Sequence, residues 1–129
     1  MLVFSTACWG TGMAMAQKLV VHHARIERDL KLLEKKYRSV RMNLAEAQRL
    51  LEAGLSLLQQ NEWQGFGARR VFKARVVNSD INQGLSSGYR LVWEETDTEI
   101  RLLHIYGKPG SEEEYRIKNE VKDRLASIG

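Results

Sequence analysis

The chain has 129 residues, of which 43% are hydrophobic and 28% are charged; these proportions suit one folded domain and exclude the intrinsically disordered class. The formal net charge is +4 and the sequence pI is about 9.4, which weakly favours a polyanionic partner such as RNA, DNA or an acidic protein segment, although many small proteins are mildly basic. The single cysteine, Cys8, excludes an internal disulfide and is compatible with a reduced, cytoplasmic location.

Residues 1–16 carry no charged side chain and are too few for a transmembrane helix. They end in a small-x-small pattern (AMA) typical of a cleavage site, but they lack the positive region and the continuous apolar core of a signal peptide. We therefore expect an extension ahead of a start at Met13 or Met15, or a disordered tail. A signal peptide and an additional packing segment are the alternatives, and we expect residues 17–129 to form the domain.

The first half of this domain predicts one strand followed by two helices. Residues 18–22 (KLVVH) are short and β-branched, as a strand requires. Helical spacing then runs through residues 24–60, with Ser39 in position to cap a second helix. One long helix would also fit the spacing, but a helix above about thirty residues is unusual in so small a domain, which favours a hairpin. The expected inward residues are Ile26, Leu30, Leu33, Tyr37, Val40, Leu44, Ala47, Leu51 and Leu58.

The second half predicts three strands and a final helix. Strands are expected at residues 71–77, 89–94 and 100–106, with a long polar loop over residues 78–88. Residues 111–128 have acidic side chains early and basic ones late, which suits a helix dipole. The inward residues expected on this helix are Tyr115, Val121 and Leu125.

This order of elements predicts an α+β domain in which an antiparallel sheet packs against an N-terminal helical hairpin and is followed by a C-terminal helix. One face of such a sheet can remain open to solvent and be available for binding.

Basic side chains of the second half are candidates for that binding face. Lys73 and Arg75 alternate along one strand and project from the same face, Arg90 begins the next strand, and Lys108 follows the last one. On an open face these charges avoid the cost of burial and can bind a phosphate backbone. An ordinary solvated strand surface is the alternative.

We expect no metal site and no cofactor. His22 and His23 are adjacent on a strand and point to opposite faces, while His104 is isolated in the sequence. The chain contains no P-loop, no G-x-G-x-x-G and no G-x-S-x-G motif.

The motifs of the second half occur in an order that resembles a known family. They are the K-x-[KR] pattern formed by Lys73 and Arg75, the G-Y-R-L-V-W run of residues 88–93, and a last strand that ends in a turn containing Lys108. Together they resemble the RelE-like branch of the RelE/ParE superfamily, the toxins of type II toxin–antitoxin systems. The resemblance covers about residues 17–115 and implies a RelE-like fold.

RelE-type toxins are ribosome-dependent mRNA endonucleases (mRNA interferases) that cleave mRNA in the ribosomal A site and inhibit translation. The resemblance implies attack of a 2′-hydroxyl on the adjacent phosphate, which needs a base, positive charge for the phosphorane and an acid. It also implies that Lys73 and Arg75 are the family's basic pair and that Arg90 contacts the phosphate. Tyr115 aligns with the tyrosine that stacks on a base and assists catalysis.

The sequence also departs from the family pattern. Pro109 stands where the best-known members place a second catalytic arginine, and the adjacent Lys108 is the candidate substitute. Two alternatives therefore stay open: a ParE-like toxin that binds DNA gyrase, and a toxin-fold protein that binds without catalysis. The basic sheet residues argue against the first, because ParE-like members usually lack them.

The resemblance further implies partners, namely the ribosome with its mRNA and an antitoxin whose extended, partly helical segment wraps the toxin. No membrane partner is expected. Leu51, Leu55 and Leu58 would meet the antitoxin near the end of the helical hairpin; alternatively they belong to the core.

Overall fold

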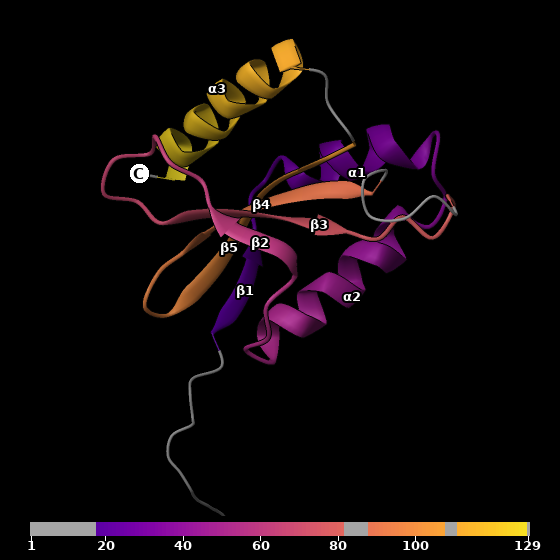
Figure 1. Cartoon of the computed structure of the whole chain (residues 1–129), viewed down its shortest axis with the longest axis horizontal. Helices are drawn as coiled ribbons and strands as arrows, with labels where there is room; N and C mark the ends of the chain where they lie inside the picture. The colour runs from indigo at the N-terminus through magenta and orange to yellow at the C-terminus, as the bar shows by residue number, and fades with distance from the viewer. Residues whose placement is uncertain (1–17, 82–87, 108–110, 129) are drawn as a thin grey trace, which may run out of the picture.

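The computed structural model describes residues 18–81, 88–107 and 111–128 of the chain (Figure 1). The expected extension, residues 1–16, and the candidate Lys108 with its neighbour Pro109 lie outside the described residues. In chain order the elements are β1 (Leu19–His22), α1 (Ile26–Glu34), α2 (Val40–Glu52), β2 (Leu58–Glu62), β3 (Val71–Val76), β4 (Tyr89–Glu95), β5 (Glu99–Tyr106) and α3 (Ser111–Ile128).

The fold class is α+β, as predicted, but the sheet is mixed rather than antiparallel. Its five strands lie in the order β1-β5-β4-β3-β2. Neighbours from β2 to β5 pair in antiparallel fashion, whereas β1 pairs with β5 in parallel. The antiparallel prediction was wrong for β1 because no hairpin connects it to its neighbour, so that strand propensity could not give its direction.

A further difference is β2, which the periodicity had assigned to the end of the second helix. That helix ends at Glu52, where Gly54 adopts a φ of +78° and its N–H donates to the carbonyl of Leu51. The next residues pair with β3, so Leu58 is a half-exposed strand residue and its predicted inward position was wrong. The polar sequence of β2 (LQQNE) carries no strand signal, and pairing with the edge of β3 decides its conformation.

Helices cover both faces of the sheet, and α3 and α2 lie on opposite sides of the strands in Figure 1. The larger core cluster joins α1 and α2 to Leu91, Trp93 and Leu102. The smaller cluster joins Val121 and Leu125 of α3 to apolar residues of the other face. The face of the sheet that could have remained open to solvent is therefore partly covered by α3. Its residues Val71, Val92 and Leu103 are too apolar to remain in water, and α3 buries them.

The inward stripe of α3 differs by one residue from the prediction. Val121 and Leu125 are buried as expected, but Tyr115 is 71% exposed. Glu114 and Ile117 precede Val121 by seven and four residues and therefore share its face, whereas Tyr115 is six residues away and points elsewhere. Among the described residues, no helix combines the length and the apolar character needed to cross a membrane.

A buried ion pair connects the helices at the edge of β5. Asp29 of α1 accepts hydrogen bonds from Arg124 of α3, at 2.6 Å (Nη1–Oδ2) and 2.9 Å (Nη2–Oδ1), and both side chains are at most 4% exposed. His104 Nδ1 and the N–H of Ile105 also donate to Asp29 Oδ2, at 2.7 and 3.3 Å. β1 pairs with β5 only as far as Leu102, so Asp29 satisfies part of the edge that β1 leaves open.

We predict that Asp29→Asn lowers the free energy of unfolding by about 3–5 kcal/mol, because it removes the buried counter-charge of the Arg124 cation. Glu120→Gln is the matched control, since Glu120 binds the same arginine at 2.8 Å but is 34% exposed; it should cost less than about 1 kcal/mol. Urea titrations at neutral pH measure both values, and equal costs would contradict the central role of Asp29.

The same pair should make stability depend on pH. Burial alone would raise the pKa of Asp29, but the hydrogen bonds from Arg124 and His104 outweigh it and hold the pKa below its ordinary value of 3.8. A lowered folded-state pKa stabilises the fold above the unfolded-state pKa, and this contribution is lost as pH falls through the folded-state pKa. The stability difference between wild type and Asp29→Asn should therefore shrink from pH 7 to pH 3.

Candidate functional site

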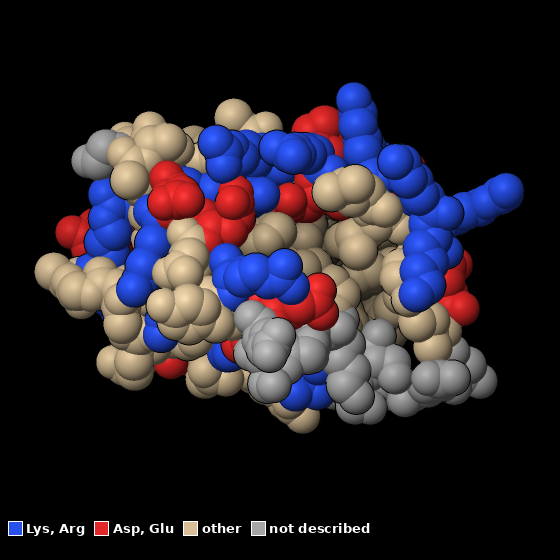
Figure 2. All heavy atoms as spheres, turned by 90° about the horizontal axis from the view of Figure 1, so that it is seen from above, with Lys and Arg blue, Asp and Glu red and all other residues tan. Residues whose placement is uncertain are grey.

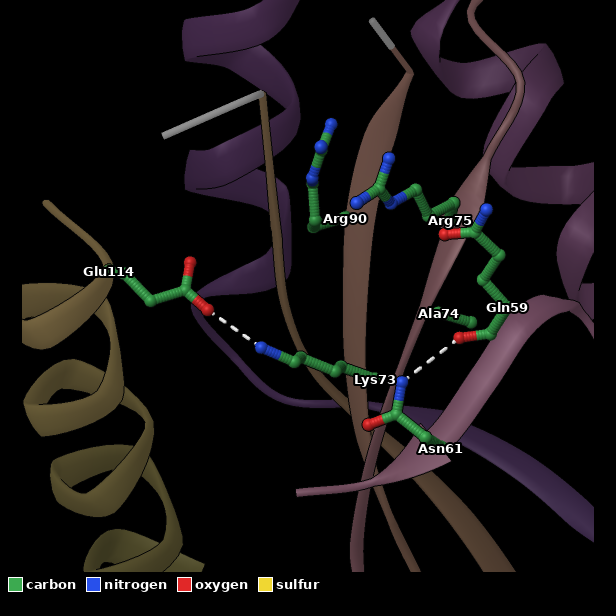
Figure 3. Close-up of a pocket in the computed structure, with 7 residues that line it drawn as sticks. All are labelled: Gln59, Asn61, Lys73, Ala74, Arg75, Arg90 and Glu114. Atoms are coloured by element: carbon green, nitrogen blue, oxygen red, sulfur yellow. Dashed lines mark hydrogen bonds and ion pairs between the residues drawn. The ribbon is translucent and has the colours of Figure 1, made fainter. Parts of the chain in front are cut away.

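The α3 side of the sheet contains a pocket with a volume of about 220 Å³ (Figure 3). Strands β2, β3 and β4 form its floor, and the first turns of α3 form one wall. The lining residues are Gln59, Asn61, Lys73, Ala74, Arg75, Arg90 and Glu114. The pocket thus gathers three cations and one carboxylate from β3, β4 and α3, and two side-chain amides from β2.

The register of the strands places two of these cations directly opposite each other. Arg75 of β3 pairs with Arg90 of β4, and Arg90 pairs in turn with Tyr106 of β5. Both arginines share a face with the buried Val71 and Val92, and Figure 3 shows them projecting from adjacent strands on the same side. Like charges at directly opposed positions of a sheet are destabilising.

Burial makes this arrangement more costly. Arg90 is only 9% exposed, and its Nη1 donates to the carbonyl of Gly88 at 2.6 Å. Burial, and secondarily the charge of Arg75, hold the pKa of Arg90 below its ordinary value. Arg75 is partly buried and forms no ion pair with an acidic side chain in the described part of the chain. An anion placed between the two guanidinium groups would relieve their repulsion, and two planar forks suit a phosphate.

The third cation is held by a carboxylate and an aromatic ring. Lys73 Nζ lies 2.7 Å from Glu114 Oε1, and the two side chains are 27% and 35% exposed. The same ammonium lies 4.3 Å from the ring centroid of Trp63, which follows β2. Glu114 reaches the pocket because it lies on the inward stripe of α3, so the position of the wall depends on how α3 packs against the sheet.

The outer rim of the pocket is formed by a bulge in β2. Pairing between β2 and β3 shifts between Leu58 and Asn61, and Gln59 between them has a φ of +52°. Gln59 is the only non-glycine residue with positive φ among those described. Asn61 Nδ2 donates to the Gln59 carbonyl at 3.1 Å, so the bulge brings two side-chain amides to the pocket. Left-handed backbone at a non-glycine residue stores strain, which is characteristic of functional sites.

Tyr106 of β5 pairs with Arg90 on the side away from Arg75. Its hydroxyl is buried and forms no hydrogen bond within the described residues. Burial, and secondarily the charge of Glu114, raise the pKa of this phenol, so it stays protonated.

No group of three or more His, Cys, Asp or Glu side chains suited to a metal ion occurs in the described part of the chain.

Three of the five site residues expected from the sequence, Lys73, Arg75 and Arg90, line one pocket. Tyr115 does not line it, and Lys108 lies outside the described residues.

Sequence reasoning missed Glu114, Gln59 and Asn61. The seven-residue spacing from Glu114 to Val121 could have identified the first, but nothing in the sequence indicated the bulge.

Figure 2 shows basic and acidic side chains interspersed on the face seen from above, with basic side chains along the border of a hollowed region.

Comparisons of the chain with protein-family models, with curated proteins and with solved structures found no match. The function of the chain is therefore inferred from the residues of the pocket and their geometry, together with the resemblance of the sequence motifs.

The strain at Gln59 can be measured. We predict that Gln59→Gly raises the free energy of unfolding by up to about 1 kcal/mol, because glycine adopts positive φ without a steric cost. Glu62→Gly, on the same strand but without positive φ, is the control and should lower stability by about 0.5–1 kcal/mol. Thermal unfolding of the two variants beside the wild type gives both signs. A loss of stability in both variants would mean that Gln59 is not strained.

Proposed function

We propose that this protein is a RelE-like toxin of a type II toxin–antitoxin system, which cleaves mRNA on the ribosome and so inhibits translation. One observation carries the proposal: Lys73, Arg75 and Arg90, which the motifs single out as RNA-contacting residues, line a single pocket. Strand pairing and burial hold Arg75 and Arg90 side by side although their charges repel each other. This arrangement does not stabilise the fold, and such local exceptions are expected at functional sites.

The pocket suits the phosphate of a single-stranded RNA. The guanidinium groups of Arg75 and Arg90 carry five N–H donors each, although Arg90 Nη1 already donates to the Gly88 carbonyl. Hydrogen bonds from charged donors to phosphate oxygens are stronger than those between neutral groups. The same two cations would stabilise the charge that develops on the pentavalent phosphorane. Partial burial strengthens both effects, because the local dielectric is lower than that of water.

The reaction requires no cofactor. The 2′-oxygen attacks the adjacent phosphorus as its proton leaves, the bond from phosphorus to the 5′-oxygen breaks, and that oxygen takes up a proton. The products are a 2′,3′-cyclic phosphate and a 5′-hydroxyl. Tyr115 directly follows Glu114 of the pocket wall, and its exposed ring offers a stacking surface for a base beside the pocket.

The proposal includes an antitoxin. A second pocket, of about 300 Å³, lies between α2 and the edge strand β2 and has a largely apolar lining that includes Met42, Leu50 and Leu58. Exposed apolar surface next to an unpaired strand edge suits an extended segment that adds a strand and buries apolar side chains. Leu51 is part of the core, whereas Leu55 and Leu58 are exposed and available to such a partner.

We predict that Arg75→Gln leaves the protein folded and slightly more stable, by up to about 1 kcal/mol, because a repulsive cross-strand pair is removed. The same variant should bind RNA about 10- to 100-fold more weakly, since charge-assisted hydrogen bonds contribute about 1.5–3 kcal/mol. Arg90→Ala should abolish growth inhibition. Arg116→Gln, an exposed arginine of α3, is the control and should retain full activity.

The decisive test is expression of the wild type and these variants in a bacterial host, with the 5′ ends of transcripts mapped. New cuts within translated codons, absent for Arg75→Gln and Arg90→Ala, would support the proposal. Growth arrest without cuts would overturn it in favour of a gyrase-type target, and absence of arrest would favour a toxin fold that binds without catalysis.

A further inference from the structure

Lys73 and Glu114 form an ion pair inside the pocket, from a strand and from the helix that covers it. We propose that this pair is the acid–base machinery of the cleavage reaction, with Glu114 as the proton acceptor for the 2′-hydroxyl and Lys73 as the proton donor to the leaving 5′-oxygen. This inference rests on the proposed RNA cleavage and assigns roles that the sequence motifs do not, since none of them includes Glu114.

Glu114 offers the pocket a proton acceptor. Among the described residues that line the pocket it is the only carboxylate, opposite the strands that hold Arg75 and Arg90 (Figure 3). Its Oε1 is engaged by Lys73, while Oε2 forms no hydrogen bond within the described part of the chain. The carboxylate is 35% exposed, so a 2′-hydroxyl can approach it. This access is the first requirement of a general base, which must come within about 2.6–3.2 Å of the oxygen whose proton it takes.

Lys73 is held in position by two contacts. Its ammonium lies 2.7 Å from Glu114 Oε1 and 4.3 Å from the ring centroid of Trp63. The lysine ammonium can give up a proton, whereas the guanidinium groups of Arg75 and Arg90 cannot, because arginine is not deprotonated in proteins. Lys73 is therefore the one cation of the described pocket that can act as an acid.

The two roles give a balanced reaction. The O–H bond of the 2′-hydroxyl breaks and its proton moves to Glu114, while the 2′-oxygen forms a bond to phosphorus. The bond between phosphorus and the 5′-oxygen breaks, and that oxygen receives a proton from Lys73. The carboxylic acid and the neutral amine that result are hydrogen-bonded partners, so one proton transfer between them restores the starting ion pair. Neither an external oxidant nor an external base is needed.

The arginines have a separate task in this scheme. Arg75 and Arg90 bind the phosphate and its developing charge but exchange no proton. Glu114, in contrast, places a negative charge beside the RNA phosphate and opposes binding. Removal of that charge should therefore have opposite effects on RNA affinity and on the cleavage rate, which a purely structural role of Glu114 would not produce.

The first experiment compares wild type, Glu114→Gln and Glu113→Gln. Cleavage is followed on ribosomes that translate a defined mRNA, with the protein in excess, and affinity is measured with a 2′-O-methyl RNA oligonucleotide that cannot be cut. For Glu114→Gln we expect cleavage at least 100-fold slower, as for other general bases, and RNA binding equal to or tighter than that of the wild type. Glu113 is an exposed neighbour, and its variant should cleave normally.

The second experiment separates the acid from the base. Lys73→Met removes the proton donor, and an mRNA with a sulfur atom in place of the 5′-bridging oxygen at the cut site provides a leaving group that needs no proton. The defect of Lys73→Met should largely disappear on this substrate, whereas the defect of Glu114→Gln should remain. Thermal unfolding of each variant checks that it is folded, and Glu114→Asp, which keeps the carboxylate, should retain partial activity.

Each outcome decides between the two proposals. If wild type cuts no mRNA on ribosomes, the proposed function fails and this inference fails with it. If wild type cuts and Glu114→Gln cuts equally fast, or loses RNA binding together with cleavage, the role of Glu114 is overturned while the proposed function stands. A Lys73→Met defect that persists on the sulfur-containing mRNA overturns the assignment of Lys73 as the acid.

Discussion

Asp29 on α1 and Arg124 on α3 meet beside the one stretch of β5 that has no strand neighbour on that side, and their bidentate ion pair joins helices that cover opposite faces of the sheet. An unpaired charge at this depth would cost several kcal/mol, so the two residues are stable only together. Their pairing fixes one part of α3 against β5, while Val121 and Ile117 continue the packing toward its first turns. The wall of the pocket, including Glu114, thus depends on an interaction at the opposite end of the helix.

The pocket, in contrast, contains features that destabilise the fold. Arg75 and Arg90 repel each other at directly opposed positions of the sheet, and Gln59 adopts a backbone conformation that is unfavourable for its residue type. Neither feature stabilises the fold, and both lie on the same few residues of β2, β3 and β4. Clustering of locally unfavourable features at one concave site is characteristic of binding or catalysis. The stabilising Asp29 network and the strained pocket therefore occupy separate regions, linked by α3.

Much of the fold followed from patterns along the chain. The β-branched runs of β3, β4 and β5, the helical spacing of α1 and α2, and the charge order of α3 all identified elements that exist. Alternation along β3 also placed Lys73 and Arg75 on one face, which is correct because side chains of a strand alternate whatever its partners are. The exceptions are local: β2 lacks any strand signal, and Tyr115 was assigned to the wrong side of α3. Pairing with β3 decides the conformation of β2, and the six-residue offset from Val121 decides the side of α3 on which Tyr115 lies.

The sequence by itself determined the α+β class, most of the elements and the presence of a basic group on the second half of the sheet, because these depend on residue type and spacing. Only the tertiary structure decided that Arg75 faces Arg90, that a bulge turns the amides of Gln59 and Asn61 into the pocket, and that Glu114 pairs with Lys73. Strand register, the direction of β1 and the packing of α3 arise from pairings between segments far apart in the sequence, as in the Asp29–Arg124 contact, whose residues are 95 positions apart. Periodicity along the chain carries no information about such pairings, which is why the composition of the site could be recognised in part but its chemistry could not.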